Sequence, residues 1–332
     1  MMNIILACDD KFCAFCAVAI KSILRYDDDI NFYIFTIGLN DKNILKLERM
    51  NTGKQSRIQI VTISKEHTDK FPMPKGEGLA HISIATYLRL FAPLVLPNVS
   101  KAIYLDCDIL VRRSLKGLWN INIEDYYLGA VYHQNILSIN NGAFNRLNIP
   151  IEQGYFNAGV LLMNLDKCRK DNVFEKWMSF IEIHAKDIVN HDQDVLNAVC
   201  GPRTLMLPAK WNTMNFFMYS RYWNQATDCY DEEYQKEFGS PERVLAEAGV
   251  FHFASRPKPW EIYCVHPVVR EFRDILKEVP FEFHYREYSS LKGCVKLFLK
   301  PQIMGYARYS YKCYKRNNPI RWMNYILDIV HP

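Results

Sequence analysis

The sequence predicts an α/β fold with a mostly parallel central sheet flanked by helices. Between residues 3 and 63, short apolar runs of strand length alternate with longer segments in which apolar residues recur at helical spacing. This alternation is typical of βαβ units, whose crossover helices place consecutive strands parallel. A chain of 332 residues with 49% hydrophobic content also has enough apolar side chains for a large core.

The same patterns assign the individual elements. Residues 3–8, 31–37 and 57–63 are predicted to be buried strands, and residues 12–26 and 42–50 are predicted to be the helices between them. Further along, we expect strands at residues 103–105, at residues 154–164 and around residue 252. We also expect one amphipathic helix over residues 165–185 and another that begins at residue 191.

Carboxylates follow two of the predicted strands. Asp9 and Asp10 come after the first strand, and Asp106 and Asp108 end a later one, so we expect both pairs at one rim of the sheet. On an extended segment Asp106 and Asp108 point to the same side, and two buried like charges require a cation. Mg²⁺ and Mn²⁺ bind such oxygen ligands and share their other positions with phosphates. The alternative is a strand end whose two carboxylates face solvent or cap the next turn.

Composition argues against several classes of protein. No glycine-rich phosphate loop follows the first strand, which argues against a dinucleotide dehydrogenase and a P-loop nucleotidase. The net positive charge comes from the residues beyond 287, which carry +7, whereas residues 1–287 carry a net charge of −2, so a nucleic-acid role for the main body has no support. The scattered cysteines favour reduced thiols in a cytosolic enzyme, and Cys13 and Cys16 are predicted to pack inside a helix.

Four other polar residues each allow two interpretations, and a fifth is a candidate phosphate ligand. Arg89 is either a helix-surface cation or part of a site, and Asn157 either binds a sugar hydroxyl or satisfies local backbone. Asp194 lies in the first turn of a helix, where a carboxylate also complements the helix dipole. His252 is either a core residue or a metal ligand beside carboxylates, and Lys258 follows a proline and could reach a diphosphate.

An ordered set of motifs carries a resemblance to a known family. The motifs are residues 7–10, 81–89, 104–108, 156–160 and 192–194, followed by His252 with residues 258–260. Together they resemble glycosyltransferase family 8, and in particular the bacterial α-galactosyl- and α-glucosyltransferases of lipopolysaccharide and lipooligosaccharide. The resemblance covers about residues 2–265. Each motif is common by itself, whereas the ordered set is specific.

The resemblance implies a GT-A fold and a UDP-hexose donor whose sugar is transferred, with its anomeric configuration retained, to a saccharide or glycolipid acceptor. It implies that Mn²⁺ (or Mg²⁺) is held by Asp106, Asp108 and His252. The implied UDP-sugar-binding residues are Ala7, Asp9, Lys11, Arg89, Asp106, Cys107, Asn157, Asp192, Gln193 and Lys258. The implied catalytic residues are Gln193, Asp192 and Lys258. Because Gln193 is a poor nucleophile, front-face attack by the acceptor is favoured over double displacement.

Departures from the family pattern concentrate on the acceptor side. His133, Asn190 and His191 differ from the residues expected there, and so do Lys11 near the ribose and Ser255 in the loop after His252. The sequence therefore names neither the acceptor nor the choice between glucose and galactose.

Two other functions of the same fold are alternatives to a glycosyltransferase. A nucleotidyltransferase would need a glycine-rich N-terminal loop, which is missing from this sequence. A non-catalytic sugar-nucleotide-binding protein would be expected to lose metal or phosphate ligands, whereas this sequence keeps all of them, namely Asp106, Asp108, His252 and Lys258.

The C-terminal region is basic and aromatic. No acidic residue occurs between Tyr288 and Leu327, and eight cations are interleaved there with aromatic residues. Aromatic side chains settle at the headgroup level of a membrane, and each cation near an anionic leaflet contributes roughly 1 kcal/mol. We therefore expect a catalytic domain over residues 1–285 and a small helical membrane-association region over residues 286–332. The protein would be cytoplasmic and peripheral at the inner face of the membrane. The alternative is a basic extension that packs on the body or is solvated.

Overall fold

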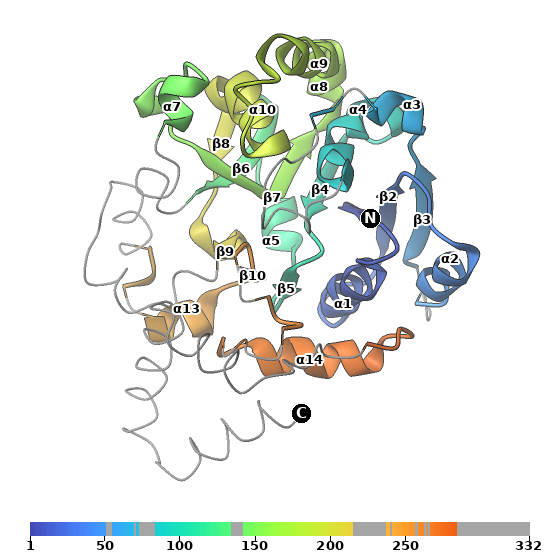
Figure 1. Cartoon of the computed structure of the whole chain (residues 1–332). Coiled ribbons are helices and arrows are strands. Elements are labelled where there is room, and N and C mark those ends of the chain that lie inside the picture. The colour runs from blue at the N-terminus through green and yellow to red at the C-terminus, as the bar shows by residue number, and fades with distance from the viewer. Residues whose placement is uncertain are drawn as a thin grey trace, which may run out of the picture.

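The computed structural model describes residues 1–50, 55–69, 71–72, 84–133, 142–214, 237–239, 241–255, 258–261, 264 and 266–283. Within these residues, seven strands form one sheet in the order β3-β2-β1-β4-β7-β6-β8 (Figure 1). Its strands are β1 (Met2–Ala7), β2 (Ile30–Thr36), β3 (Arg57–Thr62), β4 (Lys101–Leu105), β6 (Leu128–Tyr132), β7 (Phe156–Asn164) and β8 (Thr204–Met206). β7 is antiparallel to β4 and β6, and the other neighbouring pairs are parallel. The predicted mostly parallel α/β sheet is confirmed.

A second, smaller sheet lies beside the first (Figure 1). In the described residues it has the order β5-β10-β9, with β5 (Ile109–Val111), β9 (Thr213–Met214) and β10 (Val250–His252). Since β5 follows β4 after a short turn, the chain passes from the large sheet to the small one directly after Leu105. Asp106 and Asp108 lie in the turn at this crossing point.

The first half of the chain folds as its periodicity predicts. Helices α1 (Cys13–Leu24) and α2 (Asp41–Glu48) alternate with β1, β2 and β3. α2 begins where it does because the Asn40 side chain accepts a hydrogen bond from the Asn43 backbone N–H at 2.9 Å, which caps the helix. Cys13 and Cys16 are fully buried in α1, as expected for packing residues.

Helices cover both faces of the large sheet because side chains alternate along its strands. One apolar core joins alternate residues of β1 and β4 to α1, to α14 (Val269–Glu278) and to the small sheet. The other core joins the intervening residues to η1 (Ile84–Phe91), α4 (Ala92–Val95), α8 (Leu165–Lys170), α9 (Val173–His184) and α10 (His191–Cys200). The remaining short helices are α3 (Lys65–Thr68), α5 (Lys116–Trp119), α7 (Ala143–Arg146), η2 (Ile151–Gln153), η3 (Gly201–Arg203), η4 (Ala209–Trp211) and α13 (Pro241–Glu247).

One predicted element is wrong. The single helix expected over residues 165–185 is two helices, α8 and α9, that meet at Asn172. Asn172 has a φ of 50°, and a left-handed residue cannot continue a right-handed helix. The apolar pattern runs through the break because both helices pack on the same core, through residues such as Cys168 and Trp177.

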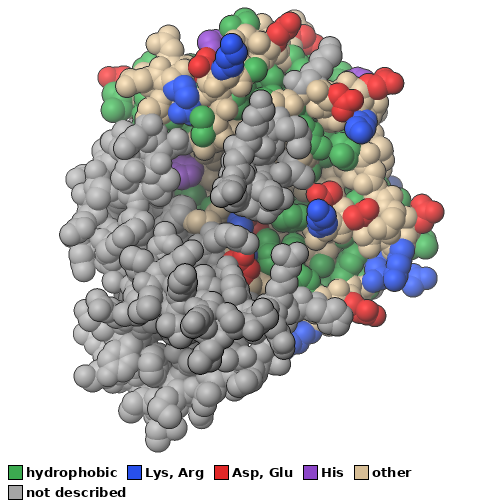
Figure 2. All heavy atoms as spheres, viewed as in Figure 1, with side chains coloured by type: hydrophobic (Ala, Val, Ile, Leu, Met, Phe, Trp, Pro, Cys, Tyr) green, Lys and Arg blue, Asp and Glu red, His purple; other side chains and the backbone are tan. Residues whose placement is uncertain are grey.

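The described surface is mixed in charge. On the face shown in Figure 2, acidic and basic side chains of the described residues are interspersed. No helix within the described ranges combines the length and the apolar character that crossing a membrane requires. The region predicted for residues 286–332 lies outside the described residues, as do residues 81–83 of the second family motif.

Candidate functional site

A cleft of about 430 Å³ opens at the carboxyl ends of β1 and β4. Its lining includes most of the residues singled out by the sequence, namely Ala7, Asp9, Arg89, Asp106, Cys107, Asp108, Asn157, Asp192, Gln193 and Lys258. Lys11 is exposed and is not among the lining residues, although its backbone N–H donates to Asp9 Oδ1 at 3.0 Å. Of the first acidic pair, only Asp9 lines the cleft. Asp10 instead accepts hydrogen bonds from Asn40 and Asn43 at the start of α2.

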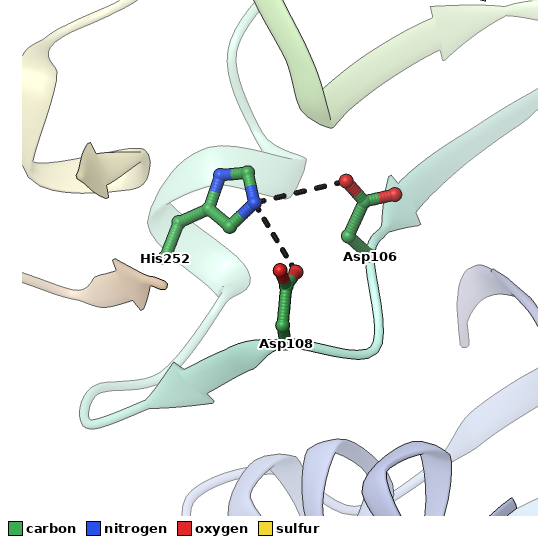
Figure 3. Close-up of side chains that lie close together, drawn as sticks. All are labelled: Asp106, Asp108 and His252. Atoms are coloured by element: carbon green, nitrogen blue, oxygen red, sulfur yellow. Dashed lines mark ion pairs between the residues drawn. The ribbon is translucent and has the colours of Figure 1, made fainter. Parts of the chain in front are cut away.

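Asp106, Asp108 and His252 form the acidic end of the cleft. Residues 106–108 are a turn between β4 and β5, not the extended segment that the sequence predicted. β5 pairs with β10 so that Ile109 lies opposite His252, which brings the histidine to the turn. His252 Nε2 lies 3.2 Å from Asp108 Oδ1 and 3.7 Å from Asp106 Oδ2 (Figure 3). One ligand atom from each residue lies within 4.8 Å of the others, an arrangement able to hold a metal ion.

Gly159 of β7 makes room for this cluster. A Cβ atom at position 159 would lie 2.2 Å from His252 Cε1 and 2.8 Å from Asp106 Oδ2. The Gly159 carbonyl also accepts a hydrogen bond from the Asp106 backbone N–H at 2.8 Å. The glycine therefore allows the histidine and one carboxylate to approach the backbone of the central strand.

Lys258 supplies a buried positive charge beside the cluster. Its Nζ lies 2.5 Å from Asp108 Oδ2 and donates to the Phe253 carbonyl at 2.6 Å. The lysine side chain is thus held at the floor of the cleft. Burial raises the pKa of the Asp108 carboxyl, but the charges of Lys258 and His252 outweigh this and hold that pKa well below its usual range.

Arg89 joins Asp106 of this cluster to Asp192. Its Nε lies 2.8 Å from Asp192 Oδ2, and one terminal nitrogen lies 2.9 Å from Asp106 Oδ1. The guanidinium also lies 4.1 Å from the centre of the Tyr104 ring. Burial lowers the pKa of Arg89, but Asp106 and Asp192 reverse the shift and raise it above its usual value. Arg89 is therefore a buried part of the site and not a helix-surface cation.

Asp192 begins α10 and is almost fully buried. Burial raises the pKa of its carboxyl to about 6, although Arg89 and a hydrogen bond from the Thr86 hydroxyl both oppose the shift. Its environment therefore places the ionisation of this carboxyl near neutral pH. Thr86 belongs to η1 and lines the cleft, and it was not singled out within the motif at residues 81–89.

Asn157 and Gln193 contact each other in the lining of the cleft. Asn157 Nδ2 donates to Gln193 Oε1 at 3.1 Å, and the Ala158 backbone N–H donates to the same oxygen at 3.0 Å. Asn212, which sequence reasoning missed, donates from Nδ2 to Asn157 Oδ1 at 2.8 Å. It also contacts His252 Nδ1 through Oδ1 at 2.9 Å. A buried asparagine gives no signal in the sequence because its partners come from distant segments.

Asp194 does not reach the cleft. It is fully buried and accepts hydrogen bonds from the Tyr155 hydroxyl at 2.5 Å and from the backbone N–H groups of Val189 and Asn190. Arg146 pairs with it at 2.9 Å. Of the two interpretations allowed by the sequence, the structure supports a role at the start of α10, where Asp194 holds the preceding loop.

The family comparison agrees with this arrangement. The model of glycosyl transferase family 8 matches residues 3–264 of the chain. A putative glycosyltransferase of Haemophilus influenzae is 32% identical over 213 residues, which are 64% of this chain and 63% of that protein. The lipopolysaccharide 1,2-glucosyltransferase of Escherichia coli K12 is 25% identical over 85% of this chain and 79% of its own length.

A solved structure shows the same architecture. The galactosyltransferase LgtC, in complex with donor and acceptor sugar analogs, superposes with a TM-score of 0.72 at 28% sequence identity. The match covers 85% of this chain and 98% of LgtC. The predicted GT-A fold is therefore confirmed, and the chain belongs to glycosyltransferase family 8.

Proposed function

We propose that the chain is a metal-dependent retaining glycosyltransferase that moves glucose or galactose from a UDP-sugar to a saccharide acceptor. The observation that carries this proposal is that Asp106 and Asp108 line the cleft beside Lys258 and that both carboxylates lie close to the buried His252. Two carboxylates and an imidazole fit Mn²⁺ or Mg²⁺. When bound, such an ion neutralises negative charge on the diphosphate of the donor.

Lys258 serves the departing UDP in this proposal. The residue is 8% exposed and its ammonium is fixed by Asp108 and by the Phe253 carbonyl, so its charge stays in place during the reaction. Negative charge grows on the leaving phosphate as the glycosidic bond breaks. A preorganised cation at that end of the cleft stabilises the charge as it develops.

The donor sugar is assigned to the wall formed by Arg89, Asn157 and Asp192. Arg89 ties Asp192 to Asp106, so the sugar-binding and metal-binding carboxylates are held by one guanidinium. Carboxylate oxygens accept hydrogen bonds from sugar hydroxyls, and the Asn157 amide offers both a donor and an acceptor group. Ala7, Asp9 and Cys107 then line the side of the cleft assigned to UDP.

Retention of configuration is proposed to proceed by front-face attack of the acceptor. Double displacement needs a carboxylate free to attack the anomeric carbon. Asp192 is engaged by Arg89 and Thr86, and Asp194 is buried outside the cleft. Gln193 is an amide whose oxygen already accepts two hydrogen bonds. That oxygen carries partial negative charge, which stabilises the positive sugar ring.

The acceptor is proposed to be lipopolysaccharide or another cell-surface glycan. The support is the named E. coli relative, which is a lipopolysaccharide glucosyltransferase. We further propose a catalytic domain over residues 1–285 and a peripheral location at the cytoplasmic face of the membrane, mediated by residues 286–332. The support for these two assignments is the charge and aromatic pattern of the sequence.

Stereochemistry tests the proposed reaction without a known acceptor. Proton NMR during early hydrolysis of UDP-glucose or UDP-galactose with Mn²⁺ should show the α-anomer of the free hexose before mutarotation, because water replaces the acceptor on the front face. An early β-anomer would contradict retention.

A further inference from the structure

Side-chain amides connect the proposed metal ligand His252 to Gln193 through the protein interior. The contacts are His252 Nδ1 to Asn212 Oδ1 at 2.9 Å, Asn212 Nδ2 to Asn157 Oδ1 at 2.8 Å, and Asn157 Nδ2 to Gln193 Oε1 at 3.1 Å. Asn212 is fully buried and Asn157 nearly so. The chain of contacts therefore runs from the buried His252 and Asn212 to Asn157 and Gln193, which line the cleft.

Backbone groups fix the direction of every hydrogen bond in this chain. The Gly159 N–H points at Asn157 Oδ1 at 2.9 Å, and the Ala158 N–H points at Gln193 Oε1 at 3.0 Å. A backbone N–H can only donate, so each of these side-chain atoms must be the amide oxygen. The Asn212 atom that faces Asn157 Oδ1 is consequently its NH₂ group, and the carbonyl oxygen of Asn212 faces His252.

The orientation of Asn212 determines the tautomer of His252. Because Asn212 presents an acceptor, Nδ1 of His252 carries the hydrogen and donates it. Nε2 then faces Asp106 and Asp108, where its lone pair would be available to a bound metal ion. Metal-binding histidines typically donate their second ring N–H in this way, which fixes both tautomer and ring orientation.

Strand pairing explains why Asn212 is available. It directly precedes β9, and β9 pairs with β10 so that Met214 lies opposite His252. Its backbone N–H also donates to the Ala209 carbonyl at 3.0 Å, which fixes the end of η4. The small sheet thus delivers both the histidine and the residue that orients it.

We propose that Asn212 is a positioning residue of the active site: it holds His252 with Nε2 toward the metal-binding carboxylates and, through Asn157, fixes the amide of Gln193. This inference rests on the metal site of the proposed function. It deepens that function by linking the metal ligand to the residue beside the donor sugar.

Three full-length variants test the inference by Mn²⁺ affinity, measured by electron paramagnetic resonance of free Mn²⁺ in the presence of UDP. Asn212→Leu keeps the side-chain size but removes the acceptor, and it should weaken Mn²⁺ binding about 10- to 100-fold. Asn212→Asp keeps an acceptor opposite Nδ1, and it should bind Mn²⁺ within about threefold of wild type. Asn164→Asp is the matched control, because it makes the same change from amide to carboxylate away from the metal site. Asn164 lies at the far end of β7, where its Oδ1 caps α8.

The aspartate variant separates the two ends of the chain of contacts. It loses the NH₂ group that faces Asn157, so donor hydrolysis should slow although Mn²⁺ affinity is kept. Wild-type Mn²⁺ affinity in Asn212→Leu, or equal losses in the leucine and aspartate variants, would overturn the inference. Failure of the wild-type protein to bind Mn²⁺ would instead count against the metal site itself.

Nitrogen NMR of ¹⁵N-histidine-labelled wild-type protein gives a second measurement that needs no variant at Asn212. In the Mg²⁺ complex, the His252 signals, assigned by their loss in His252→Gln, should show the hydrogen on Nδ1. A hydrogen on Nε2 would refute the inference.

Discussion

Gly159 lies against the metal cluster, and its missing side chain sets the distance between β7 and His252. Gly159→Ala would place a Cβ atom 2.2 Å from His252 Cε1, so the histidine must move away. We expect a loss of Mn²⁺ affinity of more than about tenfold and an overpacking cost of about 1–3 kcal/mol in the free energy of unfolding. Titration with Mn²⁺ and urea unfolding measure the two effects.

Gly129→Ala provides the control for this prediction. Gly129 lies in β6 of the same sheet, and a Cβ there would meet only the flexible tip of Leu207 at 3.1 Å. Its Mn²⁺ affinity should match that of wild type. Equal Mn²⁺ affinity in Gly159→Ala and wild type would show that the histidine does not have to lie where the structure places it.

If Asp192 binds the donor sugar as proposed, donor binding depends on pH. Burial raises the pKa of its carboxyl to about 6, so the carboxylate form that accepts hydrogen bonds from sugar hydroxyls is lost as the pH falls through that value. We expect the KM for the UDP-sugar to rise below pH 6. Asp192→Asn should have a high KM at pH 8 that rises no further between pH 7 and pH 5. A wild-type KM that stays constant over this range would exclude Asp192 from donor binding.

At the scale of single elements, the start of α10 depends on Asp194. Its buried carboxylate accepts hydrogen bonds from Tyr155 and from two backbone N–H groups, and an amide in its place would direct an NH₂ group at these donors. We expect Asp194→Asn to lower the free energy of unfolding by about 1–3 kcal/mol. Thermal and urea unfolding provide the measurement.

Asp166→Asn is the matched control for the prediction at α10. Asp166 lies in the first turn of α8 with its side chain 64% exposed, and exposed substitutions usually change stability by less than about 0.5 kcal/mol. Similar losses in Asp194→Asn and Asp166→Asn would mean that the buried network does not stabilise α10.

Local patterns predict elements well where neighbours in the sequence decide the structure. The strands and helices up to residue 63 follow their periodicity, and the proximity of Asp106 and Asp108 was also predicted. The extended conformation predicted for residues 106–108 was wrong. The chain turns there from β4 into β5, and this turn depends on the pairing of β5 with the distant β10. Asn212 gave no signal as a site residue, and Gly159 was noted only as part of the motif at residues 156–160, since the contacts of both residues to His252 arise from tertiary packing.

At the scale of the whole molecule, the catalytic cleft and the basic C-terminal region are separate parts of the proposal. Within the described part of the chain, the residues that line the cleft lie between Ala7 and Lys258, whereas the cations that favour an anionic membrane lie beyond residue 287. Four of them are Lys292, Lys296, Lys300 and Arg308. Removing positive charge there should change where the protein is found without changing its chemistry.

Replacing those four cations with glutamine should release the full-length protein from vesicles that contain anionic lipid. Each cation contributes roughly 1 kcal/mol near such a surface, and the attraction weakens with salt. Co-sedimentation at physiological ionic strength measures binding, and donor hydrolysis serves as the control for an intact cleft. Equal sedimentation of the variant and the wild type would show that these cations do not hold the protein on the membrane.

UDP release from a panel of UDP-sugars, with Mn²⁺ or with EDTA, tests the central claim most directly. Asp108 has an oxygen 3.2 Å from His252 Nε2 and another 2.5 Å from Lys258 Nζ, so the Asp108→Asn variant removes the carboxylate shared by the metal site and the lysine. The wild-type protein should release UDP from UDP-glucose or UDP-galactose only with the divalent metal, and the variant should be slower by about 10³-fold or more. Turnover that persists in EDTA and in the Asp108→Asn variant would contradict the account.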